Sequence, residues 1–578
     1  MPIDFGKRAS VLDSQPNSEL SRLSEEFFQV MNSTDPFSAT MLGVSEFDAL
    51  VPDPSRAGGR RNAARFAGIE EQLSAIDPES LNQADRINHA VLGRLAWGAR
   101  SDLEHGLWEA NASAAGYASP QALAFQAVPT APLGNAAAVD GYLQRLSALG
   151  DYFDAILDRY RQAKADERVP TRAGVLQAVE QLDGHLGLSL ADDTLLSPAL
   201  PADVDQGRAR GRMGEIVQAG VRPAMRRLRA GLQDELLPVA RGDDRVGIRF
   251  VPGGEEGYLA AVRRHTTTEL SPAEIHQIGL DRISSLQAEW SELGSRVLGT
   301  TNVPEILRSL RDDLSLRFSD SAQIVTIVAD ALNRAEAVRD RWFPEYRLPA
   351  CIIEEINPIE VNNAALAYYR PAAVDGSRPG AHCVLTANPE QRFVFEYEAL
   401  AFHESSPGHH LQIASAQGLA ELPSYRRHLD AEVCGYIEGW GLYSERLADE
   451  MGLYTSDLQR LGMVSFEALR ACRLVVDTGM HHLGWTRQQA RDYMWSNTAT
   501  PLANVSNEID RYIAWPGQAL AYMVGCREIR RLRATAEQRL GARFDIRGFH
   551  GAVLSNGAVP LGVLEGIVLT WIDSVPAR

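Results

Sequence analysis

The sequence has few cysteines and no excess of basic residues, and each absence excludes a class of protein. Its 578 residues include five cysteines without a Cys-x-x-Cys pair, which indicates reduced, mostly buried thiols of a cytoplasmic protein rather than a disulfide framework. The 57 basic side chains are outnumbered by 75 acidic ones, for a net charge of −18. This balance argues against nucleic acid or an anionic membrane as the main partner.

Neither a transmembrane helix nor a signal peptide is predicted. No apolar stretch approaches the roughly 18 residues of a membrane span. No apolar run follows the charged N-terminal residues Met-Pro-Ile-Asp-Phe-Gly-Lys-Arg either. Hydrophobic content of 45% and charged content of 23% are ordinary for a globular protein. We therefore expect a soluble, cytoplasmic protein with no membrane and no nucleic acid among its partners.

Most of the chain has the periodicity of helices. Apolar residues recur at helical spacing in the stretches 20–31, 138–161, 211–236, 303–314 and 322–342. Ser271 and Glu274 enclose Pro272 in a capping box, which predicts a helix from there to about residue 293. Strand-like segments are few and short, namely residues 246–251, 350–355 and 382–387.

The predicted fold is therefore mainly α, a large helical body with a small β-sheet beside the active site. No internal repeat or low-complexity linker divides the chain, and its Pro- and Gly-rich loops are too short to separate independent domains. We expect an N-terminal helical region, residues 1–245, and a catalytic region, residues 246–578, within one integrated domain.

The most chemically specific stretch runs from Phe402 to Ile413 and reads Phe-His-Glu-Ser-Ser-Pro-Gly-His-His-Leu-Gln-Ile. It holds three of the thirteen histidines of the chain, and Glu404 stands among them. Imidazole ligands beside a carboxylate base are what a catalytic zinc site needs. The stretch is close to the H-E-x-x-H helix of zinc peptidases, but Pro407 occupies the position of the second histidine.

Pro407 must interrupt the helix that carries His403. It has no amide hydrogen, and its ring would clash with the carbonyl group of His403 in a regular helix. The residue before a proline is also pushed toward extended geometry. A helix over residues 393–404 is therefore expected to kink or bulge before Gly408.

Two histidines compete to be the second ligand. In an unbroken helix His410 would share the face of His403, but at roughly 10 Å along the axis. A two-residue bulge would instead bring His409 to the metal, and we favour His409, with His410 behind it or in the substrate pocket. The alternative is a polar helix end that carries surface histidines.

A third ligand is predicted on a second helix, where Glu438 and Glu445 stand seven residues apart on one face. Glu438 lies among apolar neighbours, and a buried carboxylate has to be paired. We therefore expect Glu438 to bind the metal and Glu445 to orient a ligand histidine. Gly439 and Gly441 would permit close approach of another helix. The alternative is an amphipathic helix with surface glutamates.

These motifs resemble those of the bacterial family catalogued as domain of unknown function 885. The resemblance lies in His-Glu-x-x-Pro-Gly-His-His-x-Gln and Glu-Gly-Trp-x-Leu-Tyr-x-Glu, and it continues in residues 36–40, 367–369, 375–380, 470–481 and 508–522. It covers nearly the whole chain. It implies a gluzincin-like zinc hydrolase related in architecture to carboxypeptidase Taq, thimet oligopeptidase and angiotensin-converting enzyme. In such folds helices enclose a deep cleft and one strand borders the substrate, here residues 382–387.

The same resemblance suggests further site residues. Tyr512, which follows Arg511, is expected to stabilise the oxyanion with its hydroxyl group, and Tyr522 is the alternative donor. Gln518 or Arg511 would bind a substrate carboxylate.

His481 is expected to contact the substrate. It follows Asp477 by four residues on a predicted helix, so the carboxylate of Asp477 would hold the imidazole in place. The alternative is that Asp477 forms a buried salt-bridge network with Arg470 and Arg473.

The expected function is zinc-dependent hydrolysis of peptide or amide bonds in short peptides. His403, His409 and Glu438 would hold one zinc ion with a position left for water. Glu404 would take the proton of that water and deliver it to the leaving amine. Two alternatives stay open: a non-proteolytic amide hydrolase that tailors a peptide-like metabolite, and a metal-free binding protein. Manganese, cobalt or iron could use the same ligands.

Overall fold

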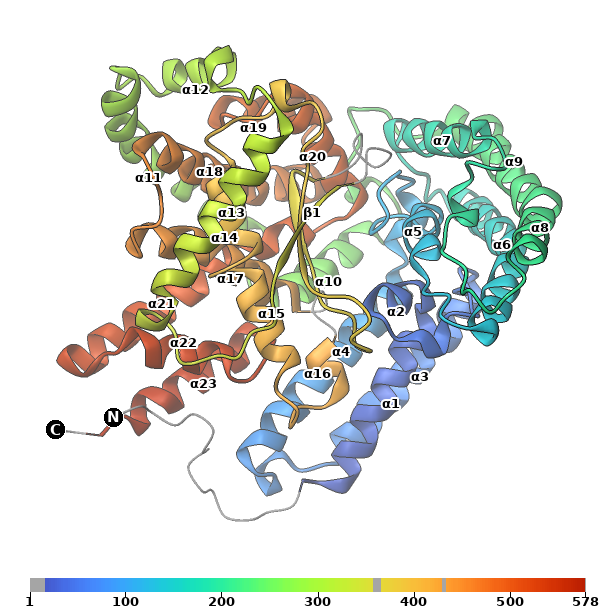
Figure 1. Ribbon diagram of the computed structural model, residues 1–578, viewed down its shortest axis with the longest axis horizontal. Helices are drawn as coiled ribbons and strands as arrows, with labels where there is room; N and C mark the ends of the chain where they lie inside the picture. The colour runs from blue at the N-terminus through green and yellow to red at the C-terminus, as the bar shows by residue number, and fades with distance from the viewer. Residues whose placement is uncertain (1–15, 357–364, 429–432, 577–578) are drawn as a thin grey trace.

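The computed structural model describes residues 16–356, 365–428 and 433–576, and it is mainly helical, as predicted (Figure 1). The helices of its first part are α1 (Ser18–Thr34), α2 (Pro36–Leu42), α3 (Arg56–Ser74), α4 (Gln83–His105), α5 (Pro120–Ala127), α6 (Ala136–Ala165), α7 (Arg172–Gly187), α8 (Gln206–Ile216) and α9 (Arg222–Ala230).

A second group of helices precedes the sheet, and a third follows it. The second consists of α10 (Gly254–Thr266), α11 (Pro272–Leu298), α12 (Val303–Asp312) and α13 (Ser321–Val338). The third consists of α14 (Tyr397–Glu404), α15 (His409–Gln417), α16 (Ser424–His428), α17 (Cys434–Glu450), α18 (Asp457–Thr478), α19 (Arg487–Asn497), α20 (Leu502–Ala514), α21 (Ala521–Leu540), α22 (Ile546–Leu554) and α23 (Leu561–Ser574). None of the described helices is both long and apolar enough to cross a membrane.

The capping box predicted at Ser271 is confirmed, although α11 ends at Leu298 rather than near residue 293, and α14 starts at Tyr397 rather than at residue 393. At the start of α11, the Ser271 hydroxyl accepts the Glu274 amide at 3.3 Å, and the Glu274 carboxylate accepts the Ser271 amide at 2.9 Å. The stretch predicted as one helix over residues 211–236 contains two π-helical turns, Val217–Val221 and Gly231–Leu236.

The strand predicted over residues 246–251 is wrong. The segment contains a short 3-10 helix, Ile248–Phe250. The amide of Ile248 donates to the imidazole Nδ1 of His481 at 3.0 Å rather than to a neighbouring strand. A hydrogen bond from this segment to a distant helical turn therefore overrides the local preference of the apolar run for an extended chain.

The sheet consists of β1 (Ile352–Glu355), β2 (Ala367–Arg370) and β3 (Ala381–Val384), in the order β1-β3-β2. β1 runs parallel to β3, and β2 runs antiparallel to it. Because β3 is the central strand, both of its edges are paired, so no further strand can add to it; the expectation that residues 382–387 border the substrate stays a prediction. β2, which the search for strand-like segments missed, is an edge strand.

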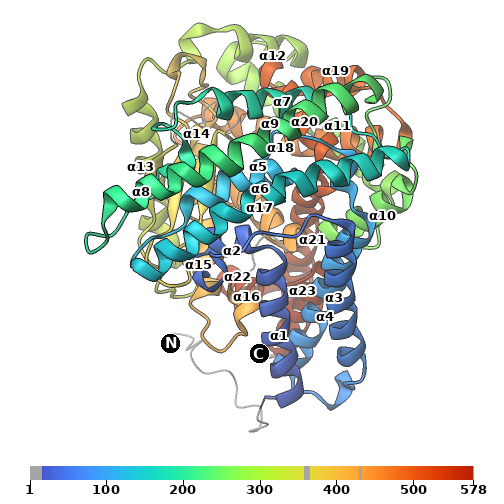
Figure 2. The ribbon, with the colours of Figure 1, turned by 90° about the vertical axis from the view of Figure 1, so that its right-hand side faces the viewer.

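The described residues form two large hydrophobic cores and a small third cluster around Ala381 and Cys383 of the sheet. One core is built from α2 and α5 to α9 and includes Phe37, Phe153 and Leu228. The other contains the apolar faces of α1, α3 and α4 together with the second and third groups of helices. α4 contacts α1 and α3 and also α23, and these helices lie in the lower part of the molecule in Figure 2. The N-terminal segment therefore shares a core with the region that carries the metal motif.

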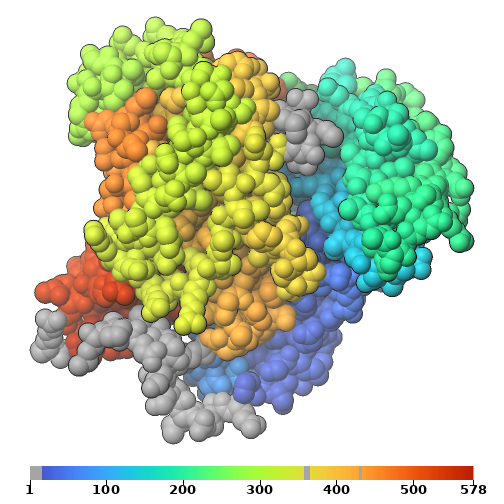
Figure 3. Space-filling model, in the orientation of Figure 1, coloured from blue at the N-terminus to red at the C-terminus, as the bar shows by residue number. Residues whose placement is uncertain are grey.

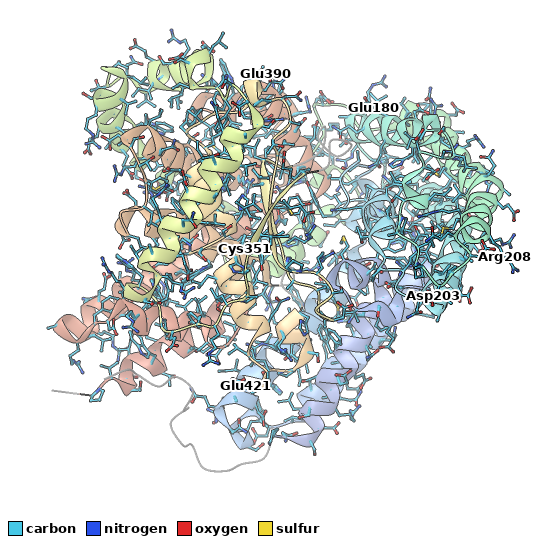
Figure 4. The ribbon with its side chains drawn as sticks, in the orientation of Figure 1. Glu180, Asp203, Arg208, Cys351, Glu390 and Glu421 are labelled. Atoms are coloured by element: carbon cyan, nitrogen blue, oxygen red, sulfur yellow. The ribbon has the colours of Figure 1, made fainter. Side chains whose placement is uncertain are left out.

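In Figure 1 and Figure 3, the helices α5 to α9 of the first core (teal to green) form the right-hand part of the molecule. The sheet, α14 and α15 (yellow to orange) lie to their left. Cys351, labelled in Figure 4, precedes β1 and is partly exposed, whereas the other four cysteines are buried and none is in a disulfide. The thiols are thus mostly buried, as predicted.

Candidate metal centre

The helix that carries His403 stops at Glu404, and α15 starts at His409. The interruption predicted at Pro407 is therefore confirmed. The indole nitrogen of Trp440 in α17 donates to the carbonyl oxygen of Pro407 at 2.9 Å. Since that carbonyl has no partner in a helix ladder at this point, the tryptophan satisfies it and ties the break to α17.

Gly408 permits the chain to return toward α14. A Cβ atom at this position would overlap the carbonyl oxygens of Phe402 and His403, so no larger residue fits without moving the backbone. The hydroxyl of Ser444 donates to the carbonyl of Phe402 at 3.0 Å. The first contact requires a glycine where the chain turns between α14 and α15, and the second holds α14 against α17.

The break brings His403 and His409 together with Glu438 of α17. The Nε2 atoms of His403 and His409 lie 3.5 Å and 3.3 Å from Oε2 of Glu438, and one nitrogen or oxygen atom from each of the three side chains lies within 4.8 Å of the others. Ligands about 2.0–2.1 Å from a tetrahedral zinc ion stand roughly 3.3–3.4 Å apart. The two measured distances to Glu438 fit that geometry.

Partners on the other ring nitrogens orient both imidazoles. Nδ1 of His403 donates to the Glu445 carboxylate at 2.8 Å, as predicted for Glu445, and Nδ1 of His409 donates to the side-chain oxygen of Gln412 at 3.4 Å. Each Nε2 is thereby directed at Glu438, which is the arrangement that zinc sites require of their histidines. Gln412 was not predicted, although it belongs to the His-His-x-Gln motif.

Gly441 was singled out only for helix packing, but it borders the cluster itself. A Cβ atom there would lie 2.7 Å from Nε2 of His403 and 2.9 Å from Cε1 of His409. Gly439, by contrast, permits the helix contact that was expected, because its Cβ would lie 2.6 Å from Cα of Gly525 in α21. The two glycines therefore serve different surfaces of α17.

The charges of the cluster reinforce one another. Burial by itself would lower the pKa of His403, but hydrogen bonds with Glu438 and Glu445 outweigh it and raise the pKa to about 9. Burial would raise the pKa of Glu438, but hydrogen bonds from His403 and His409 hold it well below its usual range. A protonated His403 thus lies next to an ionised Glu438. Binding of a metal ion there would release the proton of the imidazole.

Glu404 ends α14 directly beside the cluster. It is buried, and its Oε2 atom accepts the backbone amide of Tyr369 in β2 at 2.9 Å. Burial raises the pKa of this carboxyl group. The edge strand therefore holds one oxygen of Glu404, a contact that could be found only once β2 was placed.

His410 points away from the cluster. Its Nε2 donates to the carbonyl of Pro349 at 3.1 Å, and its Nδ1 accepts the hydroxyl of Tyr369 at 3.1 Å. Both nitrogens are thus engaged on the side of the sheet. The structure brings His409, rather than His410, to His403 and Glu438.

The two candidate tyrosines lie in different surroundings. The ring of Tyr522 stacks near that of His403, with 6.4 Å between centroids. The hydroxyl of Tyr512 accepts from Nε of Arg473 at 2.7 Å and donates to the Glu508 carboxylate. Tyr522 is therefore the tyrosine next to the histidines, and Tyr512 belongs to a buried ion pair.

Arg511 and Gln518 lie around the hydroxyl of Tyr522. Nη2 of Arg511 donates to that hydroxyl at 3.3 Å and to the side-chain oxygen of Gln518 at 3.1 Å. The amide of Gln518 also contacts the sulfur of Cys434 at 3.3 Å. These two predicted substrate contacts thus adjoin the metal cluster through Tyr522.

His481 is not brought to the cluster, and Asp477 does not hold it. Nδ1 of His481 accepts the amide of Ile248, and its Nε2 donates to the carbonyl of Tyr512 at 3.0 Å. Asp477 accepts the hydroxyl of Tyr258 at 2.6 Å and the amide of Gly517. The expected Asp477–His481 pair is therefore wrong, because each side chain has found partners on segments distant in sequence.

Comparisons with known proteins agree on the family and fold. The chain matches the family described as "Bacterial protein of unknown function (DUF885)" over residues 36–568. A candidate lipoprotein from Colwellia psychrerythraea is similar in crystal structure, with 27% identity, a TM-score of 0.88 and coverage of 96% of this chain and 99% of that one.

A second solved structure shows the same fold at lower identity. It is a candidate lipoprotein of unknown function from Shewanella oneidensis, with 17% identity, a TM-score of 0.73 and coverage of 96% of this chain and 100% of that one. No curated protein sequence matches the chain.

Proposed function

The chain belongs to the DUF885 family, and on that premise we propose that it is a zinc-dependent hydrolase of peptide or amide bonds in short peptides. The observation that carries the proposal is the position of Glu438 Oε2, 3.5 Å and 3.3 Å from the Nε2 atoms of His403 and His409. The donor set is two imidazoles and one carboxylate, which is that of several catalytic zinc sites.

The buried histidines also have the supporting contacts of metal ligands. Glu445 and Gln412 hold their Nδ1 atoms, so His403 and His409 would bind the ion through Nε2, and Glu438 through one carboxylate oxygen. When bound there, zinc supplies Lewis acidity, which lowers the pKa of water and polarises a carbonyl group. The resemblance to gluzincins further suggests that helices enclose a substrate cleft, which would admit short peptides rather than folded proteins.

Glu404 is the proposed general base. Its Oε2 is engaged by the amide of Tyr369, so Oε1 would take the proton from the attacking water and pass it to the leaving amine. The charges of His403 and His409 act to lower the pKa of Glu404 and that of Glu438 acts to raise it, which supports a position of the base beside the ligand set.

Tyr522 is the proposed donor to the oxyanion. A phenol next to the histidines can hydrogen-bond the charge that develops on the carbonyl oxygen, and the ring of Tyr522 lies near His403. This role falls to Tyr522 rather than Tyr512 because the hydroxyl of Tyr512 is already engaged by Arg473 and Glu508.

Metal content and hydrolysis, measured together, test the proposal. We expect one zinc per chain by elemental analysis of protein purified without chelator, and cleavage within a short-peptide library. Glu404→Gln should keep the zinc and lower turnover by roughly 10²–10⁴-fold. The control is Glu390→Gln, an exposed glutamate labelled in Figure 4 near the tip of the sheet region; it should change neither quantity.

Three other results would each reject part of the proposal. Protein without stoichiometric metal would favour a metal-free binding protein. Cleavage of small amides but of no peptide would favour a tailoring enzyme. Full activity of Glu404→Gln would remove Glu404 from the mechanism.

We also propose, as the sequence predicts, that the protein is cytoplasmic. The two similar structures are, in contrast, those of candidate lipoproteins. Fractionation of cells expressing the full chain tests this, and recovery in the membrane fraction would contradict the cytoplasmic prediction.

A further inference from the structure

A cavity of about 370 Å³ lies between α13 and the segment that leads into β1. Figure 1 shows α13 beside β1, and the two elements are in contact. The α13 wall consists of Ala329, Leu332, Asn333 and Glu336, which share one face of the helix. The volume is at the lower end of the range for ligand sites, roughly 300–1,000 Å³, and therefore suits a small molecule.

The floor of the cavity is the interruption between the two helices that carry the ligand histidines. Ser405 and Ser406, which separate α14 from α15, line it together with His410. The three residues of the metal cluster do not line it. The cavity therefore adjoins the break without including the metal cluster.

One part of the lining is apolar. Leu332, Leu348 and Ile353 face the cavity and pack against the hydrophobic core that also contains α14 and α15. All three side chains are half-buried, so an apolar group placed against them would remove further apolar surface from water. This part favours a ligand with an apolar side chain.

An ion pair forms the polar part. Nη1 of Arg339 donates to Oε2 of Glu336 at 2.7 Å, whereas Nη2 of Arg339 and Oε1 of Glu336 make no hydrogen bond to the described residues. The side chain of Arg339 is 18% exposed and that of Glu336 is 59% exposed. Because an exposed ion pair stabilises a protein little, a ligand can rearrange this pair at small cost.

The charges around the pair do not favour a simple anion. Nε of Arg339 lies 3.7 Å from the carboxylate of Asp340, so two carboxylates surround one guanidinium group. Phosphate would meet both carboxylates, and a simple cation would meet Arg339; like charges at such distances repel. A ligand that carries both charges avoids either repulsion.

The short distance within the pair limits how far apart those two charges can be. The free groups of Glu336 and Arg339 belong to side chains that touch at 2.7 Å. In an α-amino acid the ammonium and the carboxylate are attached to one carbon atom, whereas in a peptide they stand at opposite ends. An α-amino acid therefore matches the pair better than a peptide does.

We propose that this cavity binds a free, apolar α-amino acid. Its carboxylate pairs with Arg339, its ammonium group pairs with Glu336, and its side chain lies among Leu332, Leu348 and Ile353. Such an amino acid is also a product of the hydrolysis proposed above, but the binding inference does not rest on that function.

Calorimetric titration of the wild-type protein and of Glu404→Gln tests the inference. The probes are leucine, N-acetyl-leucine, leucinamide, glycine, the dipeptide Leu-Leu and inorganic phosphate. We expect leucine to bind roughly 10- to 100-fold more tightly than N-acetyl-leucine or leucinamide, each of which lacks one charge, the range for a charge-assisted hydrogen bond. Glycine, the dipeptide and phosphate should also bind more weakly than leucine.

Variants of the ion pair assign the binding to this cavity. Glu336→Gln and Arg339→Gln should each weaken leucine binding by roughly 10- to 100-fold. The control is Arg341→Gln, which removes an exposed arginine two residues from Arg339 that does not line the cavity. It should leave the affinity unchanged.

Cys351 supplies a measurement independent of affinity. It lines the cavity, is labelled in Figure 4, and is partly exposed, whereas the other four cysteines are buried. Saturating leucine should slow its alkylation by iodoacetamide several-fold, as followed by mass spectrometry, whereas the same concentration of leucinamide should not.

The outcomes separate this inference from the proposed function. Absence of leucine binding by the wild-type protein would overturn the inference, as would N-acetyl-leucine, leucinamide, Leu-Leu or phosphate binding as tightly as leucine. Unchanged leucine binding in folded Glu336→Gln and Arg339→Gln, or unprotected Cys351 in the leucine complex, would place the ligand elsewhere and overturn it too. Leucine binding that depends on the ion pair, in a protein that hydrolyses no library peptide, would reject the proposed function and leave this inference standing.

Discussion

Two histidine-containing regions of the molecule contain the same residue types but differ in the hydrogen-bond partners of the histidine. His403 and His481 are both buried near a helix end, and each has an acid and a tyrosine close by. His403 uses Nδ1 on a carboxylate and keeps Nε2 for a shared cluster. Both ring nitrogens of His481 form hydrogen bonds with backbone groups, those of Ile248 and Tyr512.

The acids of the two regions differ in the same way. Hydrogen bonds from two imidazoles overcome burial and hold the pKa of Glu438 well below its usual range. Burial raises the pKa of Asp477 to about 7, because no cation lies within pairing distance of it in the described residues. Both regions thus bury a histidine near an acid, and they differ in that Nε2 of His403 faces a carboxylate, whereas both ring nitrogens of His481 face backbone groups.

Removing one imidazole from each region tests this comparison most strongly. His409→Ala should lose nearly all bound zinc and all measurable hydrolysis, since two ligands hold zinc far less tightly than three. His481→Ala should keep its zinc but lose about 2–5 kcal/mol of unfolding free energy, because a buried amide and a buried carbonyl are left without partners. Elemental analysis and chemical denaturation measure both.

Loss of metal from folded His481→Ala would contradict the claim that only the His403 region binds zinc. Circular dichroism at the working temperature ensures that any loss is not caused by unfolding. Retained stoichiometric zinc in His409→Ala would equally contradict the ligand assignment.

The tyrosine of each region gives the next largest effect. Tyr522→Phe should lower kcat by about 10²–10³-fold, the range for one oxyanion donor, with little change in stability. Tyr512→Phe should leave kcat within a few-fold but lower stability, because Arg473 and Glu508 lose the hydroxyl between them. Steady-state kinetics on one cleaved peptide distinguishes the two. A larger kcat effect in Tyr512→Phe would return the oxyanion role to Tyr512.

Sequence reasoning succeeded where the chemistry is local. Pro407 forbids the regular helix, helical phase then favours His409, and the need to pair a buried carboxylate selects Glu438. Each argument uses only residues within a few turns of the residue that it concerns. The structure brings these residues together, while their roles as metal ligands await the zinc measurements.

Sequence reasoning failed where a contact joins distant segments of the chain. Nothing near Ile248 shows that its amide will donate to His481, and the short stretch Ala367–Arg370 becomes a strand by pairing with β3. The amide of Tyr369 that holds Glu404 follows from that pairing. Such partners are set by the packing of the whole chain, which spacing and periodicity do not encode.

A glycine in each region allows a matched test of packing. In Gly441→Ala the new methyl group meets both imidazoles, so zinc affinity should fall by roughly 10- to 100-fold, as for other changes in ligand orientation. In Gly247→Ala it meets the backbone of Met480, which should cost about 1–3 kcal/mol of stability without weakening zinc binding in the folded protein.

Competition with a chromophoric chelator measures the zinc affinity of both variants. Gly566→Ala is the control, because nothing lies within 4 Å of a Cβ atom at that helical position, so it should be neutral or slightly stabilising. Unchanged zinc affinity in Gly441→Ala would show that the imidazoles can move without loss of the site.

The smallest expected effect is on the pH dependence of stability and comes from Asp477, the buried acid without a cationic partner in the described residues. Because the pKa of Asp477 is about 7 in the folded protein and about 3.9 in an unfolded chain, the folded state binds more protons between these values. The stability of the wild-type protein should therefore fall as pH rises toward 7. Asp477→Asn cannot ionise, so relative to the wild-type protein it should gain about 2 kcal/mol between about pH 5 and about pH 7. Denaturant titrations at the two pH values measure the gain; an equal difference at both would mean that Asp477 is ionised throughout, and the contrast with Glu438 would then lie in hydrogen bonding rather than in charge.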